Sequence, residues 1–204
     1  MLWLETADNA APALPAVWLI QTGASPGALA ERSALRRDTA QRVLARQLDC
    51  AERNVVIAHD PAGRPLLTLP GQAGLKLSLA TRAGVVAVAL AHRPIGVDVE
   101  RIEAQGTLPF DVLHPKERAL LDATASSRRP LAFACLWAAK EAYVKALGTG
   151  FRRAPESFAV TLDAKDIFRV LDPSCPADAV GHLRLMKNGG QDALAAAAIV
   201  LDGV

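Results

Sequence analysis

The sequence predicts an α/β protein of the α+β type, made of two similar halves. Short apolar runs that end at turn residues alternate with longer segments of helical periodicity, which is typical of mixed folds. With 204 residues, of which 51% are hydrophobic, the chain is long enough to bury a substantial core. A short internal repeat, described below, favours two related halves. We place these halves at residues 1–100 and 101–204.

Strand and helix signals follow one another near the start of the chain. The apolar run at residues 16–20 ends in a glycine turn, the pattern of a buried strand. Ser25 and Pro26 resemble an N-cap and a first helical residue, so a helix is expected to begin there and to continue to Cys50. Residues 55–57 then begin the next strand.

The internal repeat consists of two predicted hairpins. Residues 75–77 and 85–90 match residues 183–185 and 193–198 at the same spacing, and both copies have an apolar second strand. Between the hairpins, residues 115–122 and 130–147 are predicted helices, and Gly148 is expected to end the second one.

Charge and cysteine usage narrow the functional classes. Lys and Arg total 23 against 21 Asp and Glu, and this net charge of +2 gives no general basic surface for nucleic acid or membrane. The uncharged stretch at residues 9–30 is broken by proline and glycine, so no membrane span or export signal is predicted. Three widely spaced cysteines predict neither a disulfide framework nor a zinc site, which favours the cytoplasm.

A hydrolase nucleophile motif is present only in form. Residues 23–27 match G-x-S-x-G between a predicted strand and a predicted helix. In that motif the residue after the serine donates its backbone N–H to the oxyanion, and Pro26 has no N–H. We therefore interpret Ser25 as a helix cap.

Two carboxylates share one face of a predicted strand. In the segment at residues 95–100, a period of two places Asp98 and Glu100 on one side and Val97 and Val99 on the other. Adjacent like charges are costly unless a cation neutralises them, and hard oxygen ligands suit Mg²⁺. A half-exposed strand with solvated acids is the alternative, and the spacing alone leaves both open.

A third carboxylate lies on the long predicted helix. Trp137, Glu141 and Lys145 recur every four residues and form one stripe, with Lys140 beside it. Glu141 would complete a metal site with the two strand acids, and the lysines would hold anionic oxygens. The alternative is a surface ion pair between Glu141 and Lys145, with Trp137 packed in the core.

The order of these two motifs resembles the 4'-phosphopantetheinyl transferase superfamily. The matching segments are Gly96-Val97-Asp98-Val99-Glu100 and Trp137-x-x-Lys140-Glu141-Ala142-x-x-Lys145-Ala146-x-Gly148. The resemblance extends to Gly63-Arg64-Pro65 and to His114-Pro115-x-Glu117-Arg118. The length and the two-half layout are similar to the monomeric Sfp-type subgroup.

The resemblance implies a fold and an activity. Two halves related by pseudo-two-fold symmetry would hold coenzyme A and Mg²⁺ in the cleft between them. The protein would transfer the phosphopantetheine arm to a serine of an acyl or peptidyl carrier protein and release adenosine 3',5'-bisphosphate. It would act as a cytoplasmic monomer, without nucleic acid or membrane as a partner.

The resemblance also assigns roles to individual residues. The implied metal ligands are Asp98, Glu100 and Glu141, with Glu141 and Lys145 as the catalytic pair and Glu141 as the base for the serine hydroxyl. The implied coenzyme A contacts are Arg37, Arg64, Thr81, Arg82, Lys140 and Lys145. Glu117 matches a family acid near the metal, and a role on a helix surface is the alternative.

One position departs from the family pattern. The family carries a histidine that contacts the 3'-phosphate of coenzyme A, where this chain has Thr81. Arg82 is expected to supply the missing positive charge. Two rival hypotheses remain: a catalytically degenerate member that binds coenzyme A or a carrier protein, and a nucleic-acid-binding domain. The second would use Arg36, Arg37, Arg42, Arg46 and Arg53, a run that acidic residues interrupt.

Overall fold

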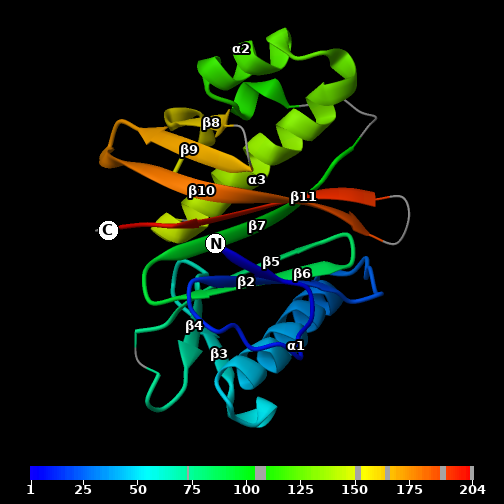
Figure 1. The fold of residues 1–204 in the computed structure, drawn as a ribbon, viewed down its shortest axis with the longest axis vertical. Helices are drawn as coiled ribbons and strands as arrows, with labels where there is room; N and C mark the ends of the chain where they lie inside the picture. Colours follow the sequence, from blue (N-terminus) through cyan, green and yellow to red (C-terminus); the bar gives the residue numbers. More distant parts are fainter. Residues whose placement is uncertain (73, 104–108, 150–152, 164–165, 189–191, 203–204) are drawn as a thin grey trace.

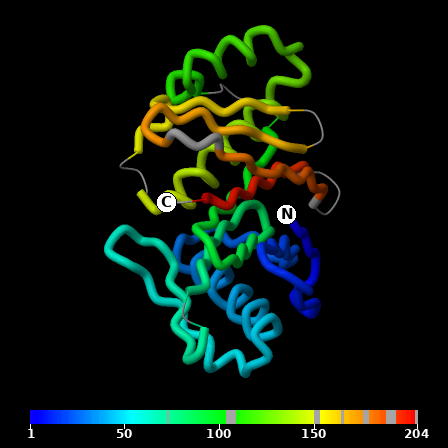
Figure 2. The backbone as a smooth tube through the Cα atoms, turned by 60° about the vertical axis from the view of Figure 1, so that its left-hand side comes forward, coloured from blue at the N-terminus to red at the C-terminus, as the bar shows by residue number. Residues whose placement is uncertain are grey.

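The protein is arranged in four layers, an α-helix, two β-sheets and a second helical layer (Figure 1). The computed structural model describes residues 1–72, 74–103, 109–149, 153–163, 166–188 and 192–202. Figure 2 shows the first half of the chain, blue to cyan, on one side of the molecule and the second half, yellow to red, on the other. Among the described residues, none of the helices has the length and apolar character needed to cross a membrane.

The first sheet has the strand order β1-β2-β6-β5. Its strands are β1 (Leu2–Leu4), β2 (Ala16–Gln21), β5 (Lys76–Arg82) and β6 (Val85–Ala91), and α1 (Leu29–Gln47) covers its outer face (Figure 1). Residues of β2 alternate between two cores, because Trp18 packs towards α1 while Val17 and Leu19 face the second sheet.

The second sheet is antiparallel, with the order β7-β11-β10-β9-β8. Its strands are β7 (Ile95–Arg101), β8 (Ala159–Asp163), β9 (Ile167–Asp172), β10 (Cys175–Asn188) and β11 (Asp192–Val200), and its outer helices are α2 (Pro115–Ala123) and α3 (Arg129–Leu147). The alanine-rich β11 presents Ala195 and Ala197 to the helices and Ala196 and Ala198 to the first sheet.

The two sheets meet where β5 packs against β7. At this junction the backbone N–H of Val97 donates to the Ser78 hydroxyl oxygen at 3.1 Å. A separate hairpin of β3 (Val56–His59) and β4 (Pro65–Thr68) extends beside β5 and α1. In the described part of the chain, single-turn 3-10 helices lie at Glu52–Asn54, Phe110–Val112, Ser126–Arg128 and Pro155–Ser157.

The predicted fold class and most predicted elements are confirmed. Each half contributes a sheet and one long outer helix, and the expected strand at residues 16–20, the two central helices and both hairpins are present. The predicted start of the first helix is wrong, because its N-cap is Ala28 and Ser25 lies before it. The division at residue 100 stays a prediction, although β7 belongs to the second sheet through its pairing with β11.

The repeat predicts the two hairpins but not their register. In the first hairpin Leu77 pairs with Leu90, and the equivalent pair in the second would be Leu185 with Ala198. Leu185 instead pairs with Ala195. The reason is the position of the connection: β10 ends two residues before the position equivalent to Arg82, and β11 begins one residue before the position equivalent to Val85, which together give a shift of three residues.

Gly96 allows α3 to approach β7 closely. A Cβ atom at this position would lie 1.8 Å from the carbonyl oxygen of Ala142, so the helix backbone occupies the space of a side chain. Asp98 and Glu100 lie on the same face of β7 as Gly96, because side chains alternate along the strand. The missing side chain therefore brings α3 within reach of both acids.

Gly96→Ala is expected to destabilise the protein by about 1–3 kcal/mol, since helix and strand must separate to admit the methyl group. Urea denaturation measures the loss. Gly27→Ala is the matched control, because a Cβ atom there meets nothing within 4 Å and its backbone is not left-handed. Equal stability of the two variants would contradict the close packing.

Candidate active-site cleft

A cleft of about 920 Å³ lies between α3, strand β5 and the β3–β4 hairpin. Glu141, Val144, Lys145 and Gly148 line it from α3 at a spacing of three and four residues, which places them on one helix face. The opposite wall comes from the first half and includes Arg36, His59, Arg64 and Leu77–Leu79. Both halves of one chain therefore build the cleft.

Lys145, which lines the cleft, forms an ion pair with Asp98. The Lys145 Nζ donates to Asp98 Oδ1 at 2.7 Å, and also to the carbonyl oxygens of Val97 at 3.2 Å and Leu79 at 3.5 Å. Asp98 is 7% exposed, and its Oδ2 is buried without a hydrogen-bond partner. Burial raises the pKa of Asp98, and the Lys145 ammonium opposes that shift.

Glu100 lies two residues further along β7 and contacts Arg82. The Arg82 Nε is 3.2 Å from Glu100 Oε2, and its Nη2 is 3.7 Å from Glu103 Oε1. Burial and the negative charge of Asp98 raise the pKa of Glu100 to about 7, although Arg82 acts in the other direction. Arg82 is thus next to the strand acids, and it is not among the residues that line the cleft.

Three carboxylates interact electrostatically at this place. Burial raises the pKa of Glu141, and the charge of Asp98 raises it further. Glu141 in turn contributes to the raised pKa of Glu100. Such mutual repulsion favours a cation among the three groups. In the described part of the chain, however, no three His, Cys, Asp or Glu side chains are grouped closely enough to hold a metal ion as they stand.

The carboxylates nevertheless fit a divalent cation in their chemistry. The unpartnered Oδ2 of Asp98 is a buried oxygen that lacks a donor, and oxygen atoms are the ligands that Mg²⁺ prefers. In this structure the Lys145 ammonium neutralises Asp98, and the Arg82 guanidinium neutralises Glu100. A bound cation would take over part of that neutralisation.

Arg64 spans the cleft from the β3–β4 turn to the end of α3. Its Nη2 donates to the Leu147 carbonyl oxygen at 3.0 Å, and Asp60 Oδ1 accepts its backbone N–H at 2.9 Å. Gly148 makes room for this guanidinium, because a Cβ atom there would lie 1.0 Å from Arg64 Nη2. Gly148 also has φ +67, the left-handed conformation of a helix C-cap, as its sequence position predicts.

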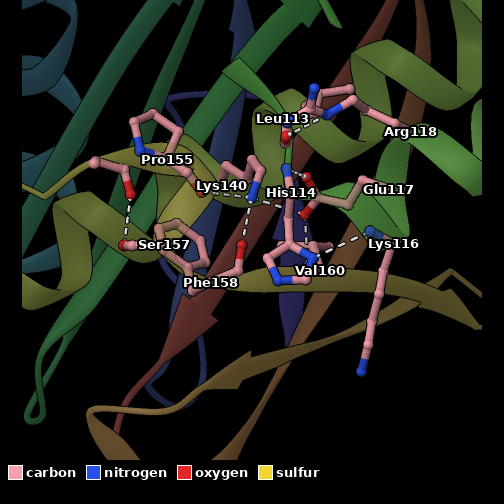
Figure 3. A network of polar contacts seen from close by, with 11 residues as sticks. Leu113, His114, Lys116, Glu117, Arg118, Lys140, Pro155, Ser157, Phe158 and Val160 are labelled. Atoms are coloured by element: carbon pink, nitrogen blue, oxygen red, sulfur yellow. Dashed lines mark hydrogen bonds and ion pairs between the residues drawn. The ribbon is translucent and has the colours of Figure 1, made fainter. Parts of the chain in front are cut away.

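Lys140 lies outside the lining of the cleft, so the structure gives no support to its expected contact with coenzyme A. It is 1% exposed, and its Nζ is 2.7 Å from Glu117 Oε1 and 2.8 Å from the carbonyl oxygens of Pro155 and Phe158 (Figure 3). Its ammonium also lies 4.2 Å from the centre of the Phe158 ring. Burial lowers the pKa of Lys140, and the contact with Glu117 opposes that shift. Because the three N–H groups of the Lys140 ammonium are donated to these three oxygens, none is left to bind a phosphate.

Glu117 is the buried partner of Lys140. It is 1% exposed, which excludes a helix-surface role. Its Oε1 also accepts the backbone N–H of Val160 at 2.7 Å, and its Oε2 accepts that of His114 at 2.9 Å, completing a capping box on α2 (Figure 3). The pair connects α2, α3 and β8 rather than contacting Asp98.

Trp137 belongs to the core side of α3. It is partly buried against the core of the second half and stacks on Phe133, with ring centroids 6.3 Å apart and planes 2° from parallel. It does not line the cleft.

Other predicted coenzyme A contacts are placed differently from the expectation. Arg37 is exposed and contacts Asp38 at 3.4 Å, while its neighbour Arg36 lines the cleft. The Thr81 hydroxyl is buried without a hydrogen-bond partner and is not part of the lining. His59, to which the sequence assigned no role, does line the cleft.

A sequence signal exists for one of these two missed residues, His59, and not for the other, Arg36. His59 follows Ile57 by two residues on β3, and Ile57 packs on the core, so strand alternation could have placed His59 on the inner face. No comparable signal separates Arg36 from Arg37. Arg36 precedes the buried Ala40 by four residues, and Arg37 precedes the buried Leu44 by seven residues. Both spacings place the arginine on the same helix face as a buried residue, so spacing does not distinguish the two.

A known protein family matches the part of the chain that carries the strand acids and the α3 residues of the cleft. A family model described as "4'-phosphopantetheinyl transferase superfamily" matches residues 94–198, which include Asp98, Glu100, Glu141 and Lys145. This chain belongs to that superfamily. The family match thus covers β7, α3 and most of β11, and β7 and α3 are the elements that bring the strand acids and the helix residues together.

Individual relatives are more distant. The 4'-phosphopantetheinyl transferase gsp of Aneurinibacillus migulanus is 26% identical over 130 residues, 63% of this chain. The chain spans about half of that relative, 53% of its length. A crystal structure of Thermotoga maritima holo-[acyl-carrier-protein] synthase is matched with a TM-score of 0.37 and 20% identity, covering 53% of this chain and 64% of that one.

Proposed function

We propose that this protein transfers the phosphopantetheine arm of coenzyme A to a serine of an acyl or peptidyl carrier protein and releases adenosine 3',5'-bisphosphate. The observation that carries the proposal is the cleft, whose basic lining lies beside three coupled carboxylates in a member of this superfamily. Arg36, Arg64 and Lys145 provide positive charge for a pyrophosphate, and Glu141 contributes an acid to the lining. Family membership supports the reaction class.

The metal is proposed to be Mg²⁺, held by Asp98, Glu100 and Glu141. When bound, it would neutralise the pyrophosphate charge and stabilise charge that develops on the transferring phosphoryl group. The unpartnered Oδ2 of Asp98 and the mutual repulsion of the three acids support this ligand set.

Glu141 is proposed as the base for the serine hydroxyl. A carboxylate whose pKa is raised accepts a proton more readily than an exposed one, and Glu141 lies on the cleft face of α3. The serine oxygen forms a bond to the phosphorus that bears the pantetheine arm. The pyrophosphate P–O bond breaks, the proton passes to Glu141, and the electron pair leaves with the bisphosphate.

Lys145 is proposed to hold a phosphate oxygen of the substrate. It keeps its 2.7 Å contact with Asp98, and its longer contacts with the carbonyl oxygens of Val97 and Leu79 are the ones that a phosphate oxygen would replace. Its side chain is 32% exposed, so it remains accessible from the cleft.

We also propose a monomer of the Sfp type that acts in the cytoplasm. One chain supplies both walls of the cleft, so a second copy is not required to complete it. All three cysteines are free thiols, which suits a reducing compartment.

Intact-mass spectrometry tests the transfer. The protein is incubated with coenzyme A, Mg²⁺ and a panel of apo carrier proteins from fatty acid, polyketide, nonribosomal peptide and lysine metabolism. We expect one phosphopantetheine group on at least one carrier, and none on the same carrier with its acceptor serine changed to alanine. Binding of coenzyme A without modification of any carrier would favour the degenerate member instead.

A further inference from the structure

The cations that neutralise the two acids of β7 are held at different distances. The Lys145 ammonium lies 2.7 Å from Asp98 Oδ1, and two backbone carbonyl oxygens accept further hydrogen bonds from it. The Arg82 guanidinium lies 3.2 Å from Glu100 Oε2 and 3.7 Å from Glu103 Oε1. Charged hydrogen bonds are usually about 2.7–2.9 Å long. Arg82 is therefore held more loosely than Lys145.

The two acids that hold Arg82 differ in exposure. Glu100 lies on the same face of β7 as Asp98, and its side chain is 20% exposed. Glu103 follows the end of β7 by two residues, and its side chain is 56% exposed. The guanidinium thus lies between a largely buried acid of the proposed metal site and an acid in solvent. It can leave the first acid and keep the second.

The backbone of Arg82 is fixed, so only its side chain has to move. Arg82 pairs with Val85, and the two residues between them, Ala83 and Gly84, have φ angles of 45° and 76°. Two residues in the left-handed region are typical of a tight hairpin turn. The Gly84 carbonyl oxygen also accepts the backbone N–H of Thr22 at 2.9 Å. A change of partner therefore needs a rotation of the Arg82 side chain and no movement of β5.

We infer that Arg82 is an internal counter-ion that exchanges with the metal ion, because it holds Glu100 in the metal-free protein and keeps only Glu103 when a divalent cation binds. This inference rests on the proposed function, in which Asp98, Glu100 and Glu141 hold Mg²⁺. A guanidinium and a divalent cation compete for the same carboxylate oxygens. Arg82 therefore lowers the affinity of the protein for divalent cations, since the contact with Glu100 must break before a cation can use that carboxylate.

This role differs from the phosphate contact that the sequence predicts for Arg82. Arg82 is not among the residues that line the cleft, whereas its contact with Glu100 places it at a proposed metal ligand. Glu103 is not part of the proposed ligand set, and it provides the position that Arg82 keeps after the exchange.

Mn²⁺ binding, followed by electron paramagnetic resonance of the free ion, tests the exchange without coenzyme A or a carrier protein. Mn²⁺ takes the same oxygen ligands as Mg²⁺. Arg82→Gln is expected to bind Mn²⁺ about tenfold more tightly than the wild type, because the competing positive charge is gone. Arg184→Gln is the matched control, since Arg184 is also an exposed arginine but pairs with Glu5 instead of a proposed metal ligand. Its dissociation constant for Mn²⁺ should equal that of the wild type.

A double-mutant cycle tests the part played by Glu103. Glu103→Gln removes the exposed acceptor of the guanidinium, so Arg82 stays on Glu100 and Mn²⁺ should bind about threefold more weakly. In the Arg82→Gln background the same substitution should leave the affinity unchanged, because no guanidinium remains to be held. An equal effect in both backgrounds would mean that Glu103 attracts the cation directly, and would overturn the exchange.

Three other results would also overturn the inference: an unchanged dissociation constant in Arg82→Gln, weaker binding in a folded Arg82→Gln protein, and no Mn²⁺ binding to either protein. Thermal melting reports on folding, and both variants should melt near the wild type because Arg82 and Glu103 are exposed. Failure of the exchange is separable from failure of the proposed function. Phosphopantetheine transfer by the wild type with unchanged Mn²⁺ affinity in Arg82→Gln would sink the exchange alone. Tighter Mn²⁺ binding in Arg82→Gln without modification of any carrier would support the exchange and sink the transfer alone.

Discussion

Asp98→Asn is expected to lower the rate of phosphopantetheine transfer by about 10²–10³-fold while the protein stays folded. The substitution keeps the shape of the side chain and removes the charge that would bind the metal. Burial already raises the pKa of Asp98, so a neutral group is compatible with this position. Lys145, which loses its anionic partner, is 32% exposed and keeps the carbonyl oxygens of Val97 and Leu79 as acceptors. Steady-state transfer to a carrier protein and thermal melting measure the two effects.

Asp122→Asn is the matched control, because Asp122 is exposed on α2 and outside the cleft. It should behave as the wild type in both measurements. Near-normal turnover in a folded Asp98→Asn protein would contradict the assignment of Asp98 as a metal ligand. Loss of activity together with unfolding would assign Asp98 to the stability of the β7–α3 junction instead.

Lys140→Met is expected to reduce the free energy of unfolding by about 3–5 kcal/mol, because it leaves the Glu117 carboxylate buried without its partner. Methionine fills much of the space of the lysine stem, so the lost charge is the main change. The carbonyl oxygens of Pro155 and Phe158 also lose their donor (Figure 3). Urea denaturation at pH 7 measures the loss.

Two further variants separate a structural role of Lys140 from a phosphate contact. Lys140→Met combined with Glu117→Gln should recover part of the stability, because the buried charge is gone and the amide oxygen can still accept the Val160 N–H. Lys116→Met is the control, since Lys116 is exposed on α2 (Figure 3). A large loss of coenzyme A affinity with wild-type stability in Lys140→Met would contradict the buried-pair role.

Sequence periodicity predicts the parts of the site that depend on a single element. The two-residue period of β7 places Asp98 and Glu100 on one face, and the four-residue spacing on α3 places Glu141 and Lys145 together in the cleft. The ion pair between Lys145 and Asp98 then joins the two elements.

The sequence alone does not predict contacts between elements that are distant along the chain. Lys140 precedes Glu141 by one residue, but on a helix that step turns the side chain by about 100°, here into the core beside α2. The ion pair with Glu117 depends on how α2 packs, which no local pattern of α3 contains. Local patterns also do not predict the register of the second hairpin, which depends on where its connection begins after Asn188. Nor do they predict the contact of Arg82 with Glu100, which forms because β5 packs against β7.

Transfer to a carrier serine, rather than to water, is the step on which the proposed function depends. A cleft with a metal and a base such as Glu141 could also activate water, so the docked hydroxyl must be held in line while water is excluded. The decisive measurement follows adenosine 3',5'-bisphosphate and modified carrier in one reaction, with and without the carrier. We expect equal molar amounts of the two products with the carrier and little coenzyme A consumed without it. Release of the bisphosphate at the same metal-dependent rate without any carrier would contradict the transferase and favour a coenzyme A hydrolase.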